Sequence, residues 1–123
     1  MVRFVYGFLP AIVKYVDDLP AEFAGQAKRI VVKILSRCRD DYGLLHHELT
    51  HVKQFYRTFM FHGVLYKFVK RYRLAAEIEA YKVQLKINAE DDKPDYTNFY
   101  ARRITEIYDL DISFVEAKEL LEA

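Results

Sequence analysis

The sequence has few cysteines, little net charge and no long apolar run, and each of these bears on the compartment and the partners of the protein. Its single cysteine, Cys38, cannot form an internal disulfide, which fits a reducing compartment. Lys and Arg (19) nearly balance Asp and Glu (18), so the net charge of +1 favours neither a nucleic acid nor an acidic partner. No apolar run is long enough to span a bilayer. Pro10 interrupts the apolar segment after Arg3, and no small-x-small cleavage site follows it. We therefore expect a soluble, cytoplasmic protein without a membrane partner.

The chain has the length and composition of one folded domain. It contains 123 residues, of which 52% are hydrophobic, and this is enough to build a single core. No internal repeat, low-complexity tract or linker divides it. We therefore predict one domain over residues 1–123.

The segment from His47 to His51 reads His-Glu-Leu-Thr-His. Because one helical turn brings residues i and i+4 to the same face, His47 and His51 can present two imidazole nitrogens to one metal ion. Glu48 then lies beside the ion, where it can take a proton from a zinc-bound water. This H-E-x-x-H pattern predicts a zinc site with its own general base, which is the chemistry of a metallopeptidase.

The residues around the motif favour a helix. Tyr42 to Met60 contains no proline, and Asp40 and Asp41 precede it as candidate N-caps. The apolar residues of this helix form one stripe, which consists of Leu45, Leu49, Val52 and Tyr56. The two motif histidines fall on another face. We therefore expect them to point away from the principal core stripe.

A catalytic zinc usually has three protein ligands and one open position, so a third ligand must come from elsewhere. A second helix is predicted from Leu74 to Asn88, and its apolar stripe consists of Leu74, Ile78, Tyr81 and Leu85. Glu77 lies close to this stripe, whereas Glu79 projects nearly the opposite way. An inward carboxylate needs a compensating charge, which a zinc ion supplies.

Glu77 is therefore the favoured third ligand. Glu79 is the first alternative, and His62 follows it. Both glutamates can also be ordinary surface residues that pair with Arg73, Lys82 or Lys86.

The rest of the chain predicts a mainly helical α+β fold with a small N-terminal sheet. A short strand or an extended start is expected over Val2–Phe8 and a strand over Lys28–Leu35, with a turn at Leu19–Phe23 between them. A break is expected at His62 and Gly63. The later helices are predicted over residues 64–72, 74–88, 96–108 and 114–121, and a capping box at Ser113 opens the last of them.

The motif region resembles a known family. Residues 47–55, His-Glu-Leu-Thr-His-Val-Lys-Gln-Phe, are followed at 77–81 by Glu-Ile-Glu-Ala-Tyr. This arrangement is similar to the zincin metallopeptidases of the gluzincin type. More narrowly, it is similar to the short single-domain zincins found in bacterial and phage genomes. The resemblance covers about Arg29 to Leu85.

The chain departs from the family in two ways. It is too short for the usual second subdomain, and Tyr81 stands where larger gluzincins have an aspartate.

The resemblance implies a role for each motif residue. By analogy with the family, His47, His51 and Glu77 hold Zn²⁺, and Glu48 is the general base. The strand Arg29–Leu35 would correspond to the edge strand along which such peptidases align an extended substrate.

We therefore expect a zinc-dependent metallopeptidase that acts on a peptide or protein substrate. Tyr72, Tyr81 and His62 are candidate donors to the oxyanion, and the sequence does not choose among them. The alternative is a non-catalytic, zinc-stabilised module that contacts nucleic acid or a protein partner through the basic and aromatic segment 66–73. The intact Glu48 argues against this alternative, because a binding site has no need of a base. The oligomeric state is left open.

Overall fold

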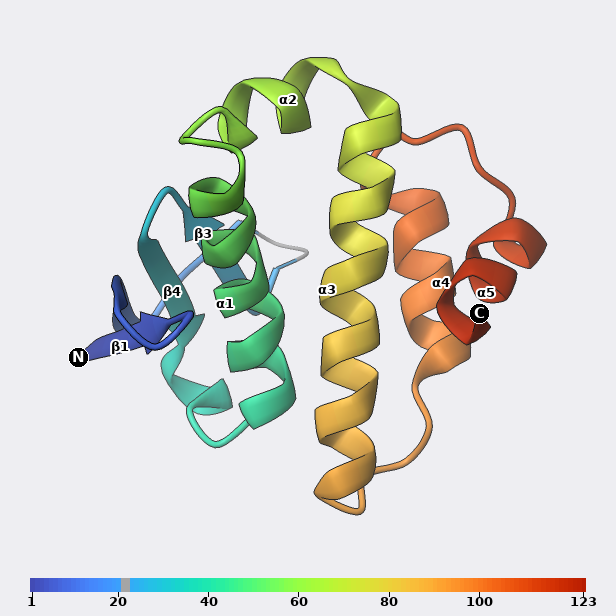
Figure 1. Cartoon of the computed structure of the whole chain (residues 1–123). Helices are drawn as coiled ribbons and strands as arrows, with labels where there is room; N and C mark the ends of the chain where they lie inside the picture. The colour runs from blue at the N-terminus through green and yellow to red at the C-terminus, as the bar shows by residue number, and fades with distance from the viewer. Residues whose placement is uncertain (21–22) are drawn as a thin grey trace.

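The computed structural model describes residues 1–20 and 23–123, and Figure 1 shows a small sheet on one side and helices on the other. The sheet contains β1 (Val2–Val5), β2 (Leu9–Val16), β3 (Gly25–Lys28) and β4 (Val31–Leu35). The helices are α1 (Tyr42–Arg57), α2 (His62–Phe68), α3 (Lys70–Glu90), α4 (Thr97–Glu106) and α5 (Phe114–Glu122). With 55% helix and 17% strand, the fold is the expected mainly helical α+β class.

The sheet differs from the two strands that the sequence predicts. Val2–Phe8 is not one strand, because β1 ends at Val5 and the chain turns back into β2. Lys28–Leu35 is not one strand either, because β3 ends at Lys28 and β4 begins at Val31. Each predicted range therefore contains a strand, but it also includes a turn that the sequence analysis did not predict. The turn predicted at Leu19–Phe23 includes residues 21–22, which lie outside the described residues.

The four strands lie in the order β1-β2-β4-β3. The β2 and β4 strands are parallel, and the two hairpin pairs are antiparallel. The strand β4 is therefore interior, and β3 is an edge strand. This corrects the expectation that Arg29–Leu35 is the edge strand.

Helix α1 joins the sheet to the remaining helices. Asp41 caps its N-terminus by accepting a hydrogen bond from the Leu44 N–H at 3.0 Å, as the sequence predicts. The predicted stripe of Leu45, Leu49 and Val52 is buried against the sheet. The opposite face of α1 lies along α3 (Figure 1). The two histidines of the motif are thus turned toward α3 rather than toward solvent.

Helices α3, α4 and α5 enclose a second apolar core. Ser113 opens α5 as predicted, because its hydroxyl accepts a hydrogen bond from the Glu116 N–H at 3.1 Å. The predicted break at His62 and Gly63 is misplaced, since both residues belong to α2. The breaks lie instead at Phe59 and Met60, which have φ of 51° and 72°, and at Val69, where α2 gives way to α3. Among the described residues, no helix is both long and apolar enough to cross a membrane.

Candidate metal centre

Three buried side chains meet between α1 and α3. His47 and His51 come from consecutive turns of α1, and Glu77 comes from the facing side of α3. His47 Nε2 lies 3.3 Å from Glu77 Oε1, and His51 Nε2 lies 3.3 Å from Glu77 Oε2. One ligand atom from each residue lies within 4.8 Å of the others. This group could hold a metal ion, and it is the set of residues that the sequence favours.

The two 3.3 Å contacts of the group are compatible with a bound metal ion. Two ligands about 2.0–2.2 Å from an ion in tetrahedral geometry stand about 3.3–3.5 Å apart. Charge-assisted hydrogen bonds are shorter, at about 2.7–2.9 Å. Glu77 is only 2% exposed, and its Oε1 has no hydrogen-bond partner among the described residues. A buried carboxylate oxygen without a donor is costly, and a cation would satisfy it.

A chain of polar groups orients His51. The His51 ring donates from Nδ1 to Gln54 Oε1 at 2.8 Å, because an amide oxygen can only accept. This hydrogen bond leaves Nε2 free to face Glu77 and an ion. The Gln54 amide in turn donates to the Ala76 carbonyl at 3.0 Å and to Glu79 Oε1 at 2.8 Å.

Glu79 lies outside the group of potential metal ligands, His47, His51 and Glu77, which we call the ligand group. Its carboxylate accepts two hydrogen bonds from Arg57, at 3.0 and 3.2 Å, in addition to the one from Gln54. The structure therefore does not bring Glu79, the alternative ligand, into the group of potential metal ligands. Glu79 instead forms the outer end of the polar chain that holds His51. The sequence places the two glutamates on different faces of α3, and this difference separates their roles.

Helix α2 supplies the nearest hydroxyl group to the ligands. Tyr66 donates to Glu77 Oε2 at 2.5 Å, and its ring lies edge-on to the His51 ring. Sequence reasoning missed Tyr66 as a site residue, because no motif links it to Glu77. His62 also lies outside the ligand group, although its ring centroid is 5.8 Å from that of His51. The Tyr72 hydroxyl is hydrogen-bonded to His62 Nδ1 at 2.5 Å rather than to His47, His51 or Glu77.

On the other side of the group, Tyr81 packs against His47 with ring centroids 4.4 Å apart. Its hydroxyl is hydrogen-bonded to Tyr108 at 2.8 Å and accepts from Arg103 Nε at 3.1 Å. Of the three candidate oxyanion donors, Tyr81 and His62 thus lie beside the ligand rings. Tyr72 contacts His62 but not the ligand rings.

The charges in the group are strongly coupled. Burial raises the pKa of Glu77, but the facing His51 and His47 side chains outweigh it and hold the pKa well below its usual range. Burial likewise lowers the pKa of His51, but the Glu77 carboxylate raises it to about 9. Without a bound ion, these pKa shifts favour a carboxylate on Glu77 and a protonated ring on His51. By contrast, burial and the nearby His51 lower the pKa of His62 to about 4, so His62 is neutral.

Glu48 is buried beside the ligands, with its Oε1 3.9 Å from His47 Nε2. Burial raises the pKa of Glu48 above its ordinary value, although the two histidines lower it in part. Strand β3 passes directly over this side chain. A Cβ at Gly25 would lie 3.1 Å from Glu48 Cγ, which is tighter than ordinary van der Waals contact, so a larger residue at this position would require a neighbouring side chain to shift. Gly25 is a second site residue that the sequence did not reveal.

A cleft of about 870 Å³ opens over Glu48 and the ligands. Strand β3 forms one wall from Gly25 to Lys28, and α2 forms the opposite wall from His62 to Phe68. A second hollow of about 410 Å³ continues past His47 toward Tyr100. The candidate site is therefore accessible along the edge of the sheet.

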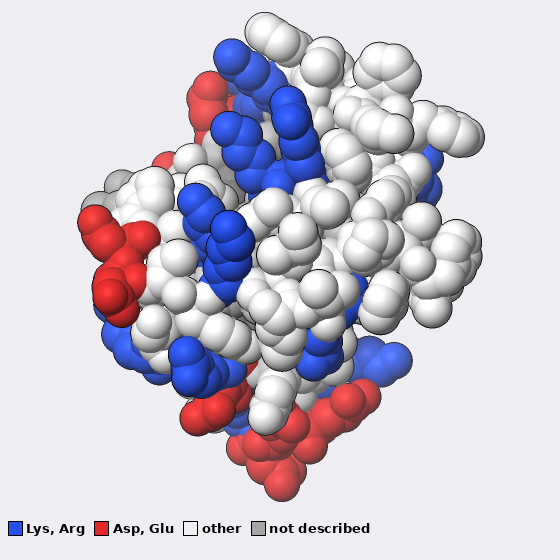
Figure 2. All heavy atoms as spheres, turned by 90° about the vertical axis from the view of Figure 1, so that its left-hand side faces the viewer, with Lys and Arg blue, Asp and Glu red and all other residues white. Residues whose placement is uncertain are grey.

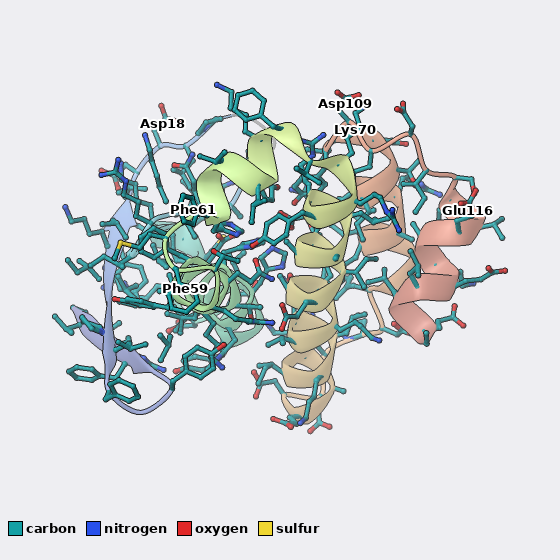
Figure 3. All side chains as sticks on the ribbon, turned by 45° about the horizontal axis from the view of Figure 1, so that its top comes forward. Asp18, Phe59, Phe61, Lys70, Asp109 and Glu116 are labelled. Carbon is teal, nitrogen blue, oxygen red and sulfur yellow. The ribbon has the colours of Figure 1, made fainter. Side chains whose placement is uncertain are left out.

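The segment 66–73 makes more internal contacts than its sequence suggests. Arg73 donates to the carbonyl oxygens of Tyr66, Lys67 and Asp109. Lys70 pairs with Asp111 at 2.7 Å and with Asp109 at 3.8 Å, and Figure 3 shows Lys70 and Asp109 together at the start of α3. Two of its four cations are thus engaged within the chain.

Comparison with known proteins adds no relative. No protein family, no curated protein and no solved structure matches this chain. The functional argument therefore depends on the site itself.

Proposed function

We propose that this protein is a zinc-dependent metallopeptidase. The observation that carries the proposal is the buried group of His47, His51 and Glu77, which opens on a cleft beside Glu48. Two imidazoles and one carboxylate leave a position for a substrate or water, as in catalytic zinc sites. The same donor set also suits Fe²⁺, but the base at Glu48 favours hydrolysis.

In this proposal His47, His51 and Glu77 hold the ion. When it is bound, zinc supplies Lewis-acid chemistry, because it polarises a carbonyl group and lowers the pKa of water. Gln54 and Tyr66 keep the ligand side chains of His51 and Glu77 in place.

Glu48 is the general base and then the general acid. Its carboxylate accepts a proton from the attacking water and returns it to the amine that leaves. The raised pKa of Glu48, which comes mainly from burial, suits both transfers, since a catalytic acid and base works best with a pKa near the working pH. Tyr81 and His62 flank the ligands and are the candidates to donate to the developing oxyanion.

Strand β3 is suited to hold an extended peptide. The Ala24 carbonyl accepts from the Leu35 N–H at 2.9 Å, so Ala24 points toward β4. Because successive residues of an antiparallel strand point to alternate sides, the backbone groups of Gly25 and Ala27 face the open edge. An added peptide strand would pair with them and pass over Glu48. The edge-strand role thus moves from Arg29–Leu35 to β3.

The substitution Glu48→Gln tests the proposal. The variant keeps the shape of the side chain but loses the base, so we expect hydrolysis of a labelled, unfolded protein to fall on the order of 10²–10⁴-fold. Zinc content, measured by mass spectrometry, should stay unchanged. Glu90→Gln is a matched control, since Glu90 is an exposed glutamate at the far end of α3. Undiminished cleavage by zinc-loaded Glu48→Gln would refute the assigned base.

A further inference from the structure

The charges of this chain are separated in a way that the net charge conceals. Residues 1–76 contain 13 Lys and Arg against 6 Asp and Glu, whereas residues 77–123 contain 6 against 12. The first part forms the sheet, α1, α2 and the start of α3, so one side of the molecule is basic. Figure 2 views the sheet side, where blue side chains run through the middle of the face and red ones gather at its left and lower margins.

The exposed apolar side chains gather on the same side. Sixteen large hydrophobic residues are exposed among the described residues, and eleven of them lie in two short segments, 1–8 and 59–69. Phe59 is 84% exposed, Phe8 73% and Phe68 72%. We call these eleven the aromatic face: Met1, Val2, Phe4, Tyr6, Phe8, Phe59, Met60, Phe61, Val64, Phe68 and Val69. In Figure 2 uncharged atoms dominate the upper right.

The two segments of the aromatic face adjoin at the end of α1. Lys53 of α1 lies 5.7 Å from the Tyr6 ring, and Tyr56 donates to the Pro10 carbonyl at 2.6 Å. The hairpin turn after β1 therefore lies against the last turns of α1. Figure 3 shows Phe59 and Phe61 where α1 passes into α2. Left-handed φ angles at Tyr6, Phe59 and Met60 mark both places as tight turns that expose their side chains.

Cations border this face. Lys67 lies 5.4 Å from the Phe68 ring, and Arg71 lies four residues further along the chain, in the first turn of α3. Within residues 1–20 and 23–123, Lys53, Lys67 and Arg71 form no ion pair with an acidic side chain. Apolar side chains on exposed turns, with cations beside them, are complementary to an apolar layer under an anionic surface.

We propose that the aromatic face docks on a bilayer rich in anionic phospholipids. Its turns place Phe, Met and Val side chains at the depth of the acyl chains, while Lys53, Lys67 and Arg71 lie at the phosphates. A second copy of the chain fits less well, because a symmetric contact would bring like charges together. Nucleic acid also fits less well, because five of the eleven side chains of the face are Met or Val and offer no ring on which bases stack.

The proposal departs from the expectation of no membrane partner. That expectation depended on the absence of a membrane-spanning segment, and peripheral docking needs no such segment. It also orients the cleft. Met60, Val64, Lys67 and Phe68 belong both to the border of this face and to the cleft wall. A docked molecule would therefore open its cleft at the bilayer surface.

Flotation with lipid vesicles tests the proposal. The full chain should float with vesicles of phosphatidylcholine mixed with phosphatidylglycerol and should not float with phosphatidylcholine alone. The double variant Lys67→Ala, Arg71→Ala should partition about 25-fold less well, at about fivefold for each charge. The double variant Phe59→Ser, Phe61→Ser should no longer float, and its melting temperature should stay near that of the wild type because both rings are exposed.

Val115→Ser is the matched control, since Val115 is 62% exposed but lies on α5, and its partitioning should equal that of the wild type. Equal flotation with both kinds of vesicle, or unchanged flotation of both double variants, would overturn the proposal. So would a dimer in light scattering, or binding to a single-stranded oligonucleotide, that the same substitutions abolish while vesicles are not bound.

Discussion

At the scale of single residues, each end of the ligand group is held by a neighbour outside the H-E-x-x-H motif. Gln54 holds His51, and Tyr66 holds Glu77. The motif spacing was sufficient to predict that His47 and His51 share a face, and helical periodicity was sufficient to prefer Glu77 over Glu79. Tyr66 was not predictable, because its contact with Glu77 depends on how α2 and α3 meet at the break at Val69, and no local pattern encodes that arrangement.

Tyr66→Phe should weaken the metal site without disturbing the fold. The substitution removes the hydroxyl that donates to Glu77 Oε2, while the ring remains in place. Loss of such an outer contact typically lowers metal affinity about 10–100-fold. A competition titration against a coloured zinc chelator measures the effect. Tyr72→Phe is the control, because its hydroxyl is bonded to His62. Equal affinities for wild type and Tyr66→Phe would contradict this role.

Metal binding should release a proton from His51. The pKa of this imidazole is raised to about 9 by Glu77, against burial, and an ion can bind only the neutral ring. Zinc affinity should therefore rise about tenfold per pH unit as the pH approaches 9 and then level off.

The stability of the metal-free fold should have the opposite pH dependence. Its His51–Glu77 pair stabilises the fold below the ordinary pKa of 6.5, and this contribution is lost as the pH rises through about 9.

Calorimetric titrations with zinc in buffers of different ionisation enthalpy count the protons released. Close to one proton near neutral pH is the expected value. Affinity that does not change with pH below 9 would show that His51 is not protonated in the metal-free protein.

At the scale of elements, the helices were easier to predict than the strands. Helix α1 has a cap and a regular stripe, and α5 has a capping box, so both begin where the sequence indicates. The hairpin between β3 and β4 turns at Arg29 with φ of 57°, and no Gly, Asn, Asp or Pro marks the turn. The sequence therefore reads as one continuous strand there, and the edge strand over the site was assigned wrongly.

Gly43 sets how closely α1 approaches α3. A Cβ at this position would lie 2.3 Å from Asn88 Oδ1 and 3.2 Å from Gln84 Cγ, and Asn88 is itself bonded to Tyr100. Gly43→Ala should therefore destabilise the protein by about 1–3 kcal/mol, since the two helices must separate.

Gly63→Ala provides a matched comparison, because nothing lies within 4 Å of a Cβ there and Gly63 is in α2. It should stabilise the protein by about 0.4–1 kcal/mol. Urea unfolding curves of both variants measure these changes. If Gly43→Ala were as stable as the wild type, the tight contact between α1 and α3 would be refuted.

At the scale of the whole molecule, the candidate metal centre lies where two apolar cores meet. The first core joins the sheet to α1, and the second joins α3 to α4 and α5. An ion held by His47 and His51 on one side and Glu77 on the other would tie the two halves together. Overall charge and composition could not indicate this arrangement or the basic side of the molecule, because both depend on which residues the fold brings together.

The central claim is that one ion is held by His47, His51 and Glu77, and metal content by native mass spectrometry tests it most directly. We expect one zinc per chain in the wild type and in Glu79→Ala, whose carboxylate lies outside the group. We expect none in His47→Ala or Glu77→Ala. Zinc retained by Glu77→Ala, zinc lost from Glu79→Ala with the fold intact, or iron in place of zinc in the wild type would contradict the account.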